Sequence, residues 1–220
     1  MISGVRMVLL GRQGAGKGTQ CVRLARHYVV PHISTGDMLR AAVKEGTEFG
    51  ARAKEVMDAG GLVSDEIMIG VVDERLHQSD TTRRGYVLDG FPRTVPQAEA
   101  LDSIAGDLPL HVVVNLEVPE EVVIERITSR RQCVDCQAIY SVKEPPKYAW
   151  HCDNCGGDVV QRDDDTEEAI RRRLELYLKE TSPLIEYYES QSLLAEVDGL
   201  GTTDEVSARL MAVVDERIAR

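Results

Sequence analysis

Short apolar runs alternate with stretches of helical spacing along most of the chain. The runs from Val5 to Leu10 and from His111 to Leu116 are almost entirely apolar, which is typical of strands buried on both faces of a parallel sheet. The alternation of such strands with helices predicts an α/β fold, with a five-stranded parallel sheet and helices on both of its faces. The predicted strands are 5–10, 32–34, 86–89, 111–116 and 193–197.

Residue types at the ends of the periodic segments indicate where the helices begin. Ser64 suits an N-cap, Thr94 and Gln97 have the spacing of a capping box, and Pro119 suits the first helical position. The expected helices are 19–28, 38–45, 48–59, one after residue 64, one after residue 94, 119–131, 166–189 with an interruption near 183, and 203–219. The stretch 132–161 has few helix signals.

The segment from Gly11 to Thr19 joins the first strand to the first helix. Its four glycines permit positive φ angles and close approach to a ligand, and the amide groups at a helix start attract an anion. Lys17 adds a cation and Thr19 a hydroxyl near a metal ion. A plain glycine-rich turn is the alternative, but the order of strand, loop, lysine and helix favours a phosphate-binding loop. The predicted phosphate-binding residues are Gly14, Ala15, Gly16, Lys17, Gly18 and Thr19.

A second motif, Asp89-Gly90-Phe91-Pro92-Arg93, follows another predicted strand. An acid at a strand end beside a phosphate loop can orient water on a magnesium ion, although the motif alone is equally typical of a surface turn. Ligands of open parallel sheets bind at the carboxyl ends of the strands. Gly11, Thr35 and Asp89 are therefore expected to converge on one crevice.

Four of the five cysteines form two Cys-x-x-Cys pairs, fifteen residues apart. This spacing is a strong zinc-ribbon signal, and four thiolates leave no open position on the metal, so the predicted site is structural. A redox-active pair is the lesser interpretation. The predicted ligands are Cys133, Cys136, Cys152 and Cys155, and the fifth cysteine, Cys21, is expected to be a small core residue.

The overall charge limits the classes of partner. The 220 residues carry a net charge of −11, which argues against a general nucleic-acid or acidic-membrane binder. A polyphosphate would have to be held by clustered arginines. No run of eighteen apolar residues exists, so no membrane span is expected and a cytoplasmic location is predicted.

Three motifs together resemble those of adenylate kinases, within the nucleoside monophosphate kinase family. They are the phosphate loop Gly-x-x-Gly-x-Gly-Lys-Gly-Thr at 11–19, Ser-Thr-Gly-Asp at 34–37, and the motif at 89–93. The resemblance covers essentially the whole chain. Gln13 replaces the usual proline, a change expected to matter little because proline donates nothing to phosphate. Gly18 also stands where the general phosphate-loop pattern has Ser or Thr.

The resemblance implies a reaction and a division of the chain. The reaction is reversible, Mg²⁺-dependent transfer between ATP and AMP to give two ADP, which maintains the balance of adenine nucleotides. The implied core P-loop domain comprises 1–33, 64–128 and 166–220, with a helical AMP-binding insert at 34–63 and a zinc-ribbon lid at 129–165. Part of the family carries a metal-bound lid of this kind.

The resemblance also places AMP. It implies that the Thr35 hydroxyl faces the adenine side, that Arg40 contacts the phosphate, and that Gln97 hydrogen-bonds the adenine, unless it serves only as the capping residue. Thr35 favours AMP over uridylate. The implied AMP-binding set is Thr35, Arg40, Gly61, Leu62, Val63, Gly90, Phe91, Pro92, Arg93, Gln97, Arg162 and Arg173.

The arginine-rich segments supply the implied ATP side. Arg126 and Arg130, four residues apart, are expected to share a helix face, whereas Arg131, Arg171 and Arg172 are expected to be solvated. The resemblance makes Asp163 and Asp164 the acids that orient Arg162 and Arg173. Implied ATP contacts beyond the phosphate loop are Arg126, Arg130, Ile139, Tyr140 and Gly201, and the implied catalytic set is Lys17, Asp89, Arg93, Arg130, Arg162 and Arg173.

Three other functions remain open at this stage. A related kinase with another donor or acceptor base is the nearest. A P-loop switch carrying a zinc-ribbon interaction module needs only one nucleotide, and the arginines on both sides argue against it. A nucleic-acid-binding ribbon conflicts with the acidic balance. The expected partners are the small molecules ATP, AMP and ADP, and the expected state is a monomer.

Overall fold

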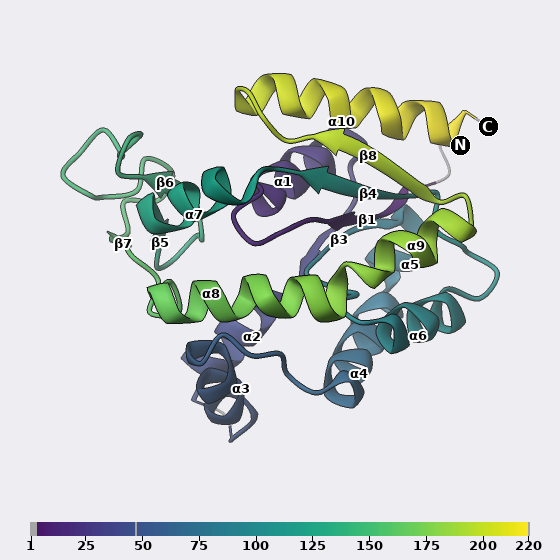
Figure 1. Ribbon diagram of the computed structural model, residues 1–220, viewed down its shortest axis with the longest axis horizontal. Helices are drawn as coiled ribbons and strands as arrows, with labels where there is room; N and C mark the ends of the chain where they lie inside the picture. The colour runs from purple at the N-terminus through teal and green to yellow at the C-terminus, as the bar shows by residue number, and fades with distance from the viewer. Residues whose placement is uncertain (1–3, 47, 220) are drawn as a thin grey trace.

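The computed structural model describes residues 4–46 and 48–219, and its centre is a five-stranded parallel sheet (Figure 1). The predicted α/β class and the strand number are confirmed. The strand order is β2-β3-β1-β4-β8, so the first strand lies in the middle. The strands are β1 (Arg6–Leu10), β2 (His32–Ser34), β3 (Tyr86–Asp89), β4 (Val112–Glu117) and β8 (Leu194–Asp198).

The helices cover both faces of this sheet (Figure 1). Side chains alternate along each strand, so Met7 and Leu9 pack into one buried apolar cluster, while Val8 and Leu10 pack into the other. The first cluster includes side chains from α1, α7, α8 and α10, and the second includes side chains from α2, α4, α6 and α9. The helices are α1 (Lys17–Tyr28), α2 (Thr35–Lys44), α3 (Glu48–Asp58), α4 (Asp65–Leu76), α5 (Ser79–Arg84), α6 (Val95–Ala105), α7 (Glu120–Ser129), α8 (Glu167–Leu176), α9 (Pro183–Ser190) and α10 (Thr203–Ile218).

A second, smaller sheet lies beyond α7 at the end of the molecule toward which the β4 and β8 arrows point (Figure 1). Its antiparallel strands are β5 (Arg130–Cys133), β6 (Ile139–Ser141) and β7 (Val159–Val160), in the order β6-β5-β7. Its buried apolar cluster consists of Cys133, Cys152 and Val159, with Ala138 and Tyr140 packed against it. Cysteine side chains thus stand where a larger domain would have an apolar core.

Several predicted boundaries are wrong, for local reasons. The first helix begins at Lys17 rather than Thr19, because Gly16 takes the left-handed N-cap position. The second helix opens at Thr35 and so includes nearly all of the predicted stretch 38–45, because Ser34 accepts the N-cap hydrogen bond from the Asp37 amide. Pro119 is the N-cap of α7 rather than its first helical residue.

The helix predicted to run to residue 131 ends at Ser129, because the backbone of Arg130 is extended. Arg126 and Arg130 therefore do not share a helix face. The short helix α5 was not predicted. The interruption predicted near residue 183 is a π-helical turn, η1 (Tyr177–Thr181), between α8 and α9.

The predicted domain limits enclose distinct elements but stay a prediction. The segment 34–63 contains α2 and α3, and 129–165 contains the small sheet. Residues 1–3 and 220 of the predicted core, and residue 47 of the predicted AMP-binding insert, lie outside the described residues.

Candidate active site

The phosphate loop wraps the start of α1 in the conformation that its glycines permit. Gly14 and Gly16 have φ angles of 84° and 101°. A Cβ atom on Gly14 would lie 2.8 Å from the Val123 carbonyl oxygen, so only glycine fits between the loop and α7. The Lys17 ammonium group donates to the carbonyl oxygens of Gly11 (2.6 Å) and Arg12 (3.0 Å). The Lys17 side chain is thereby folded back over the phosphate loop.

Asp89 ends β3 beside this loop, as predicted. One of its carboxylate oxygens lies 3.5 Å from the Cβ position of Gly18, and the register pairs Leu9 with Asp89. Burial acts to raise the pKa of Asp89, but His32 and Lys17 outweigh it, so the pKa is lowered and the group is a carboxylate. Burial lowers the pKa of Lys17, and Asp89 opposes that shift. An ionised oxygen ligand facing the loop suits Mg²⁺, which prefers oxygen ligands and retains several waters.

The loop after Asp89 packs against the start of α2. The Thr35 hydroxyl, which is buried, donates to the Gly90 carbonyl oxygen at 2.8 Å, and Arg93 Nε donates to the same oxygen at 2.8 Å. Gly90 has a φ of 81°, and a Cβ atom there would meet the Thr35 hydroxyl at 2.8 Å. Phe91 and Pro92 lie between Gly90 and Arg93 in the chain. Phe91 is fully buried, and the peptide bond that joins it to Pro92 is cis. Thr35, Gly90 and Arg93 thus form one contiguous unit.

Gln97 supports this unit through two side-chain hydrogen bonds. Its side-chain oxygen accepts from the Arg93 amide at 2.8 Å, and its side-chain nitrogen donates to Asp65 at 2.8 Å. Thr94 accepts from the Gln97 amide, but no described bond returns from the Gln97 side chain to the Thr94 amide. The capping box predicted from the spacing is therefore only half formed, and the other half is replaced by a bond that positions Arg93.

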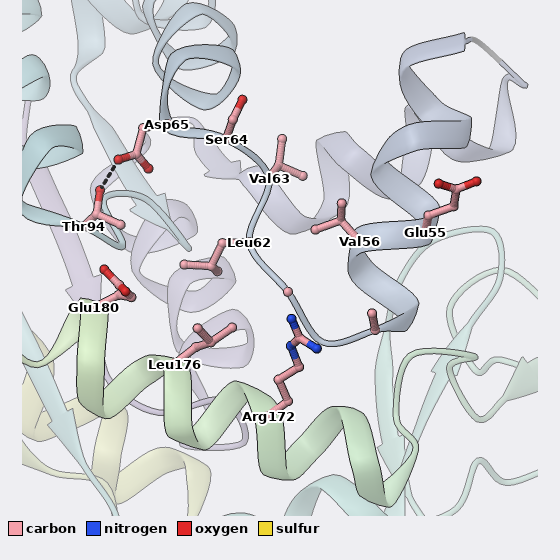
Figure 2. Close-up of a pocket in the computed structure, with 12 residues that line it drawn as sticks. Glu55, Val56, Leu62, Val63, Ser64, Asp65, Thr94, Arg172, Leu176 and Glu180 are labelled. Carbon is pink, nitrogen blue, oxygen red and sulfur yellow. Dashed lines mark hydrogen bonds between the residues drawn. The ribbon is translucent and has the colours of Figure 1, made fainter.

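Gly61, Leu62 and Val63 form the segment between α3 and α4, on one wall of a cavity of about 610 Å³ (Figure 2). Arg172, Leu176 and Glu180 of the α8 region form the opposite wall. The cavity includes none of the arginines of the predicted catalytic set. Arg40, the remaining predicted AMP contact, pairs with Asp37 one turn earlier in α2.

Two arginines from distant segments contact a buried pair of acids. Arg130 contacts both carboxylate oxygens of Asp165, at 2.8 and 2.5 Å. Arg173 contacts Asp164 at 2.6 Å and also donates to the Met57 carbonyl oxygen at 2.9 Å, which links α8 to the predicted AMP-binding insert. The pair that orients the arginines is therefore Asp164 and Asp165, rather than the predicted Asp163 and Asp164, because Asp163 is exposed.

Arg162 adjoins this cluster and donates to the side-chain oxygen of Gln132 in β5. Burial lowers the pKa of Arg162 to about 9, and the positive charges of Arg130 and Arg40 act in the same direction. Gathering several guanidinium groups is costly without anions. The cluster is therefore electrostatically suited to a polyphosphate.

Gln13 belongs to this cluster, although no role was predicted for it. With its amide oxygen toward the arginines, it accepts from Arg130 at 3.1 Å and from Arg173 at 2.7 Å. Its departure from the usual proline was the available signal. Asp165 was also missed, since nothing in a run of three aspartates shows which two will be buried.

The other predicted ATP contacts are more dispersed. Arg126 donates to the carbonyl oxygens of Ala15 and Gly199, both at 3.2 Å, and so joins the phosphate loop to the segment that contains Gly201. Gly201 has a φ of 105°. Ile139 is exposed on the small sheet. The Tyr140 hydroxyl contacts Cys152 Sγ at 3.3 Å and accepts from the Asp153 amide at 2.8 Å.

The four predicted zinc ligands converge. Their sulfur atoms lie within 4.8 Å of one another, with Cys133–Cys155 at 3.5 Å and Cys136–Cys152 at 3.4 Å. A disulfide has a bond length near 2.05 Å, so these contacts are not disulfides. Tetrahedral Zn–S bonds of about 2.3 Å would place the sulfurs about 3.8 Å apart. The residues present therefore fit a structural Zn²⁺.

A phosphate loop with its lysine, an ionised aspartate at the next strand end and a buried arginine cluster together define a class of protein. They are the parts from which P-loop phosphotransferases are built. No helix among the described residues has the length and apolar character needed to cross a membrane.

Comparisons with known proteins identify the family. Residues 9–193 match the family model described as adenylate kinase. The chain is 48% identical to the adenylate kinase of Thermodesulfovibrio yellowstonii, over 97% of this chain and 100% of that protein. It is 49% identical to the adenylate kinase of Archaeoglobus fulgidus, over 96% and 99%, and 49% identical to that of Syntrophobacter fumaroxidans, over 96% and 100%. The chain belongs to the adenylate kinase family and is a phosphotransferase of the nucleoside monophosphate kinase type.

Proposed function

We propose that the chain transfers the γ-phosphoryl group of Mg-ATP to AMP, reversibly, giving two molecules of ADP. The observation that carries the proposal is the arginine cluster between two phosphate sites. Gln13 of the phosphate loop accepts hydrogen bonds from Arg130 and Arg173, which connects both arginines to the donor side. Arg173 also donates to the Met57 carbonyl oxygen on the acceptor side. Membership of the adenylate kinase family supports the same reaction.

The donor phosphates occupy the loop from Gly14 to Thr19 in this proposal. The backbone amides and Lys17 neutralise charge on the transferred group, and Arg126 adjoins the donor nucleotide where the phosphate loop meets Gly199. Mg²⁺ would supply further charge neutralisation at the donor phosphates, held beside the loop through Asp89. Asp89 is placed to accept hydrogen bonds from its water ligands. Ile139, Tyr140 and Gly201 complete the proposed donor side.

The acceptor AMP occupies the unit formed by Thr35, Gly90 and Arg93, with Arg40 on its phosphate. Gln97 positions Arg93 and faces the adenine, while the segment from Gly61 to Val63 supplies backbone contacts. The AMP phosphate oxygen is already anionic, so the nucleophile needs no base. Positioning and charge neutralisation by Arg93, Arg130, Arg162 and Arg173 supply the rate.

The four-cysteine cluster acts structurally in this proposal, holding Zn²⁺ that keeps the lid folded. The lid covers the donor and excludes water, which prevents wasteful hydrolysis. The segments 34–63 and 129–165 act as the AMP-binding insert and the lid on the core formed by the rest. A monomer in the cytoplasm, with no nucleic-acid or membrane partner, completes the proposal.

A coupled assay of ADP formation from ATP and AMP tests the function directly. We expect ADP to form only when both nucleotides and Mg²⁺ are present, at two ADP per ATP consumed. Replacement of AMP by GMP, CMP or UMP, and of ATP by GTP, tests the base preference. ATP hydrolysis that is independent of AMP would contradict the proposal and favour a nucleotide switch. Faster turnover with another acceptor base would reassign the substrate.

A further inference from the structure

A second cluster of metal-ligating side chains lies behind the phosphate loop, apart from the four-cysteine site. Cys21 Sγ, a ring nitrogen of His32 and a carboxylate oxygen of Asp89 all lie within 4.8 Å of one another. The proposed catalytic chemistry uses only Asp89. We propose that Cys21, His32 and Asp89 form an inhibitory site for a soft divalent cation such as Zn²⁺, which withdraws Asp89 from the active site.

The fold brings these groups together from three elements. Ser34 of β2 is paired with Asp89 of β3, and His32 lies two residues before Ser34, so His32 and Asp89 project from the same face of the sheet. The neighbouring Val87 packs in the apolar cluster that also contains Cys21 of α1. The convergence is therefore fixed by strand register and by the packing of α1 on this face.

The histidine nitrogen has no strong partner. His32 Nε2 is buried and makes no hydrogen bond among the described residues, and its ion-pair distance to Asp89 Oδ2 is 3.8 Å. A buried ring nitrogen without a partner is costly. A metal ion between the two groups would satisfy both.

The donor set selects zinc over magnesium. One thiolate, one imidazole and one carboxylate are ligand types of Zn²⁺, whereas Mg²⁺ takes oxygen ligands. Around tetrahedral zinc, sulfur, nitrogen and oxygen ligands lie about 3.3–3.6 Å apart. The observed separations, all within 4.8 Å, therefore need to shrink by no more than about 1.5 Å. Three protein ligands leave the fourth position to water.

The charges balance at the proposed site. Burial raises the pKa of the Cys21 thiol well above its usual value, so the group is protonated without metal. On binding, Cys21 forms a Zn–S bond and its proton leaves to solvent. Thiolate and carboxylate then carry two negative charges, which Zn²⁺ neutralises, while Lys17 keeps its own charge. The side chains of His32 and Asp89 are 19% and 14% exposed, whereas Cys21 is fully buried.

Metal binding tests this inference without reference to turnover. Protein whose four-cysteine site already holds one equivalent of Zn²⁺ is titrated with Co²⁺. We expect one further equivalent to bind, with a thiolate-to-metal charge-transfer absorption band. Cys21→Ala and His32→Gln, made separately, should each weaken this equivalent by about a hundredfold or more, because even residues that only orient a ligand contribute about 10–100-fold.

His77→Asn is the matched control, because His77 forms an exposed pair with Asp73 at 3.1 Å but has no nearby thiol ligand among the described residues. It should leave the second equivalent unchanged. Equal binding in wild type, Cys21→Ala and His32→Gln, or a second equivalent without a thiolate band, would overturn the inference.

Inhibition is the second readout and rests on the proposed function. Added Zn²⁺ should lower the activity of the wild type at concentrations that leave Cys21→Ala and His32→Gln unaffected, each variant being compared with its own zinc-free rate. Equal zinc sensitivity in all three would overturn the inhibitory role. If ATP and AMP give no ADP at all, the proposed function fails, while the Co²⁺ titration still decides the metal site.

Discussion

The main sheet and the lid are held together by different means. The sheet lies between two large apolar clusters, in which strand side chains such as Met7, Val8, Leu9 and Leu10 are almost fully buried. The small sheet of the lid buries only Cys133, Cys152 and Val159 as its own cluster. A segment of about thirty residues with so little apolar burial does not form a firm core without a staple.

This difference separates the proposed catalytic groups into two sets. Lys17, Asp89 and Arg93 are attached to the main sheet, where apolar packing fixes them. Arg130 begins β5, and Arg162 follows β7 closely, so both depend on the lid. Asp165 holds Arg130 of the lid set, and Asp164 beside it holds Arg173 of α8. Changes in the main sheet should therefore affect chemistry directly, whereas changes in the lid should act through stability and through part of the arginine cluster.

The largest expected effect comes from Lys17→Met. The ammonium group meets charge that grows during transfer, and removal of one preorganised donor typically costs about a hundredfold or more in kcat. The melting temperature should change little, because Met keeps the length of the side chain. Lys179→Met is the control, since Lys179 is exposed beside Glu180. A kcat near that of the wild type would remove the central role given to the phosphate loop.

Arg93→Ala and Thr35→Ala separate the acceptor from the donor within the main sheet. Both should raise the KM for AMP far more than the KM for ATP. Arg93 should matter more, at about tenfold or above, because charge-assisted hydrogen bonds are the stronger ones at about 1.5–3 kcal/mol. Separate KM values for the two nucleotides provide the measurement.

Arg171→Ala is the matched control for Arg93→Ala, because Arg171 makes an exposed pair with Glu167 on the solvent side of α8. Equal losses for ATP and AMP in both acceptor variants would show that the acceptor site has been placed wrongly.

Substitution of the zinc ligands tests the lid half of the comparison between the lid and the main sheet. Cys133→Ser combined with Cys136→Ser should abolish the structural metal equivalent and lower the melting temperature by several degrees, since about 1 kcal/mol shifts it by about 2–4 °C in a chain of this size. Activity at low temperature should fall only in part, through Arg130, Arg162 and Tyr140. Metal analysis, thermal melting and the coupled assay are the measurements.

Two controls sharpen the zinc experiment. The pair Cys152→Ser and Cys155→Ser should reproduce the effect, whereas Val134→Ser should not, because Val134 is exposed between two ligands. Full inactivation with an unchanged melting temperature would contradict a structural role for the metal.

The same contrast explains how far the sequence could be interpreted. Apolar runs and glycine positions depend on local rules, so the five strands of the main sheet were predicted to within about one residue. The phosphate loop and the four cysteines adopt the compact arrangements that their spacing suggested, while the ligands that they hold stay a prediction. The helix that was expected to continue to residue 131 ends at Ser129, because the strand that begins at Arg130 pairs with β6, and its later residues pair with the more distant β7. Long-range pairing of this kind leaves no mark in the helical periodicity.

The choice of partners within the arginine cluster could likewise not be predicted from the sequence. Asp163, Asp164 and Asp165 are chemically identical, and only the burial of the last two selects them. Gln13 contacts Arg130 and Arg173 because the phosphate loop and the α7–α8 region meet in space. The replacement of proline by Gln13 was expected to matter little because only contacts to phosphate were considered. Contacts between Gln13 and these arginines were not.

Gln13 provides the smallest and finest test, because it joins the two regions. Gln13→Pro removes a neutral acceptor from Arg130 and Arg173, but the two contacts between Arg130 and Asp165 remain. We therefore expect kcat/KM to fall by about tenfold, since a hydrogen bond to a charged group is worth about 1.5–3 kcal/mol and the retained contacts to Asp165 keep the loss at the lower end of that range. Gln13→Glu should be more harmful, because its carboxylate would compete with the nucleotide phosphates for both arginines. Steady-state kinetics of the two variants give the comparison, and a glutamate variant as active as the proline variant would show that these arginines do not meet the phosphates near residue 13.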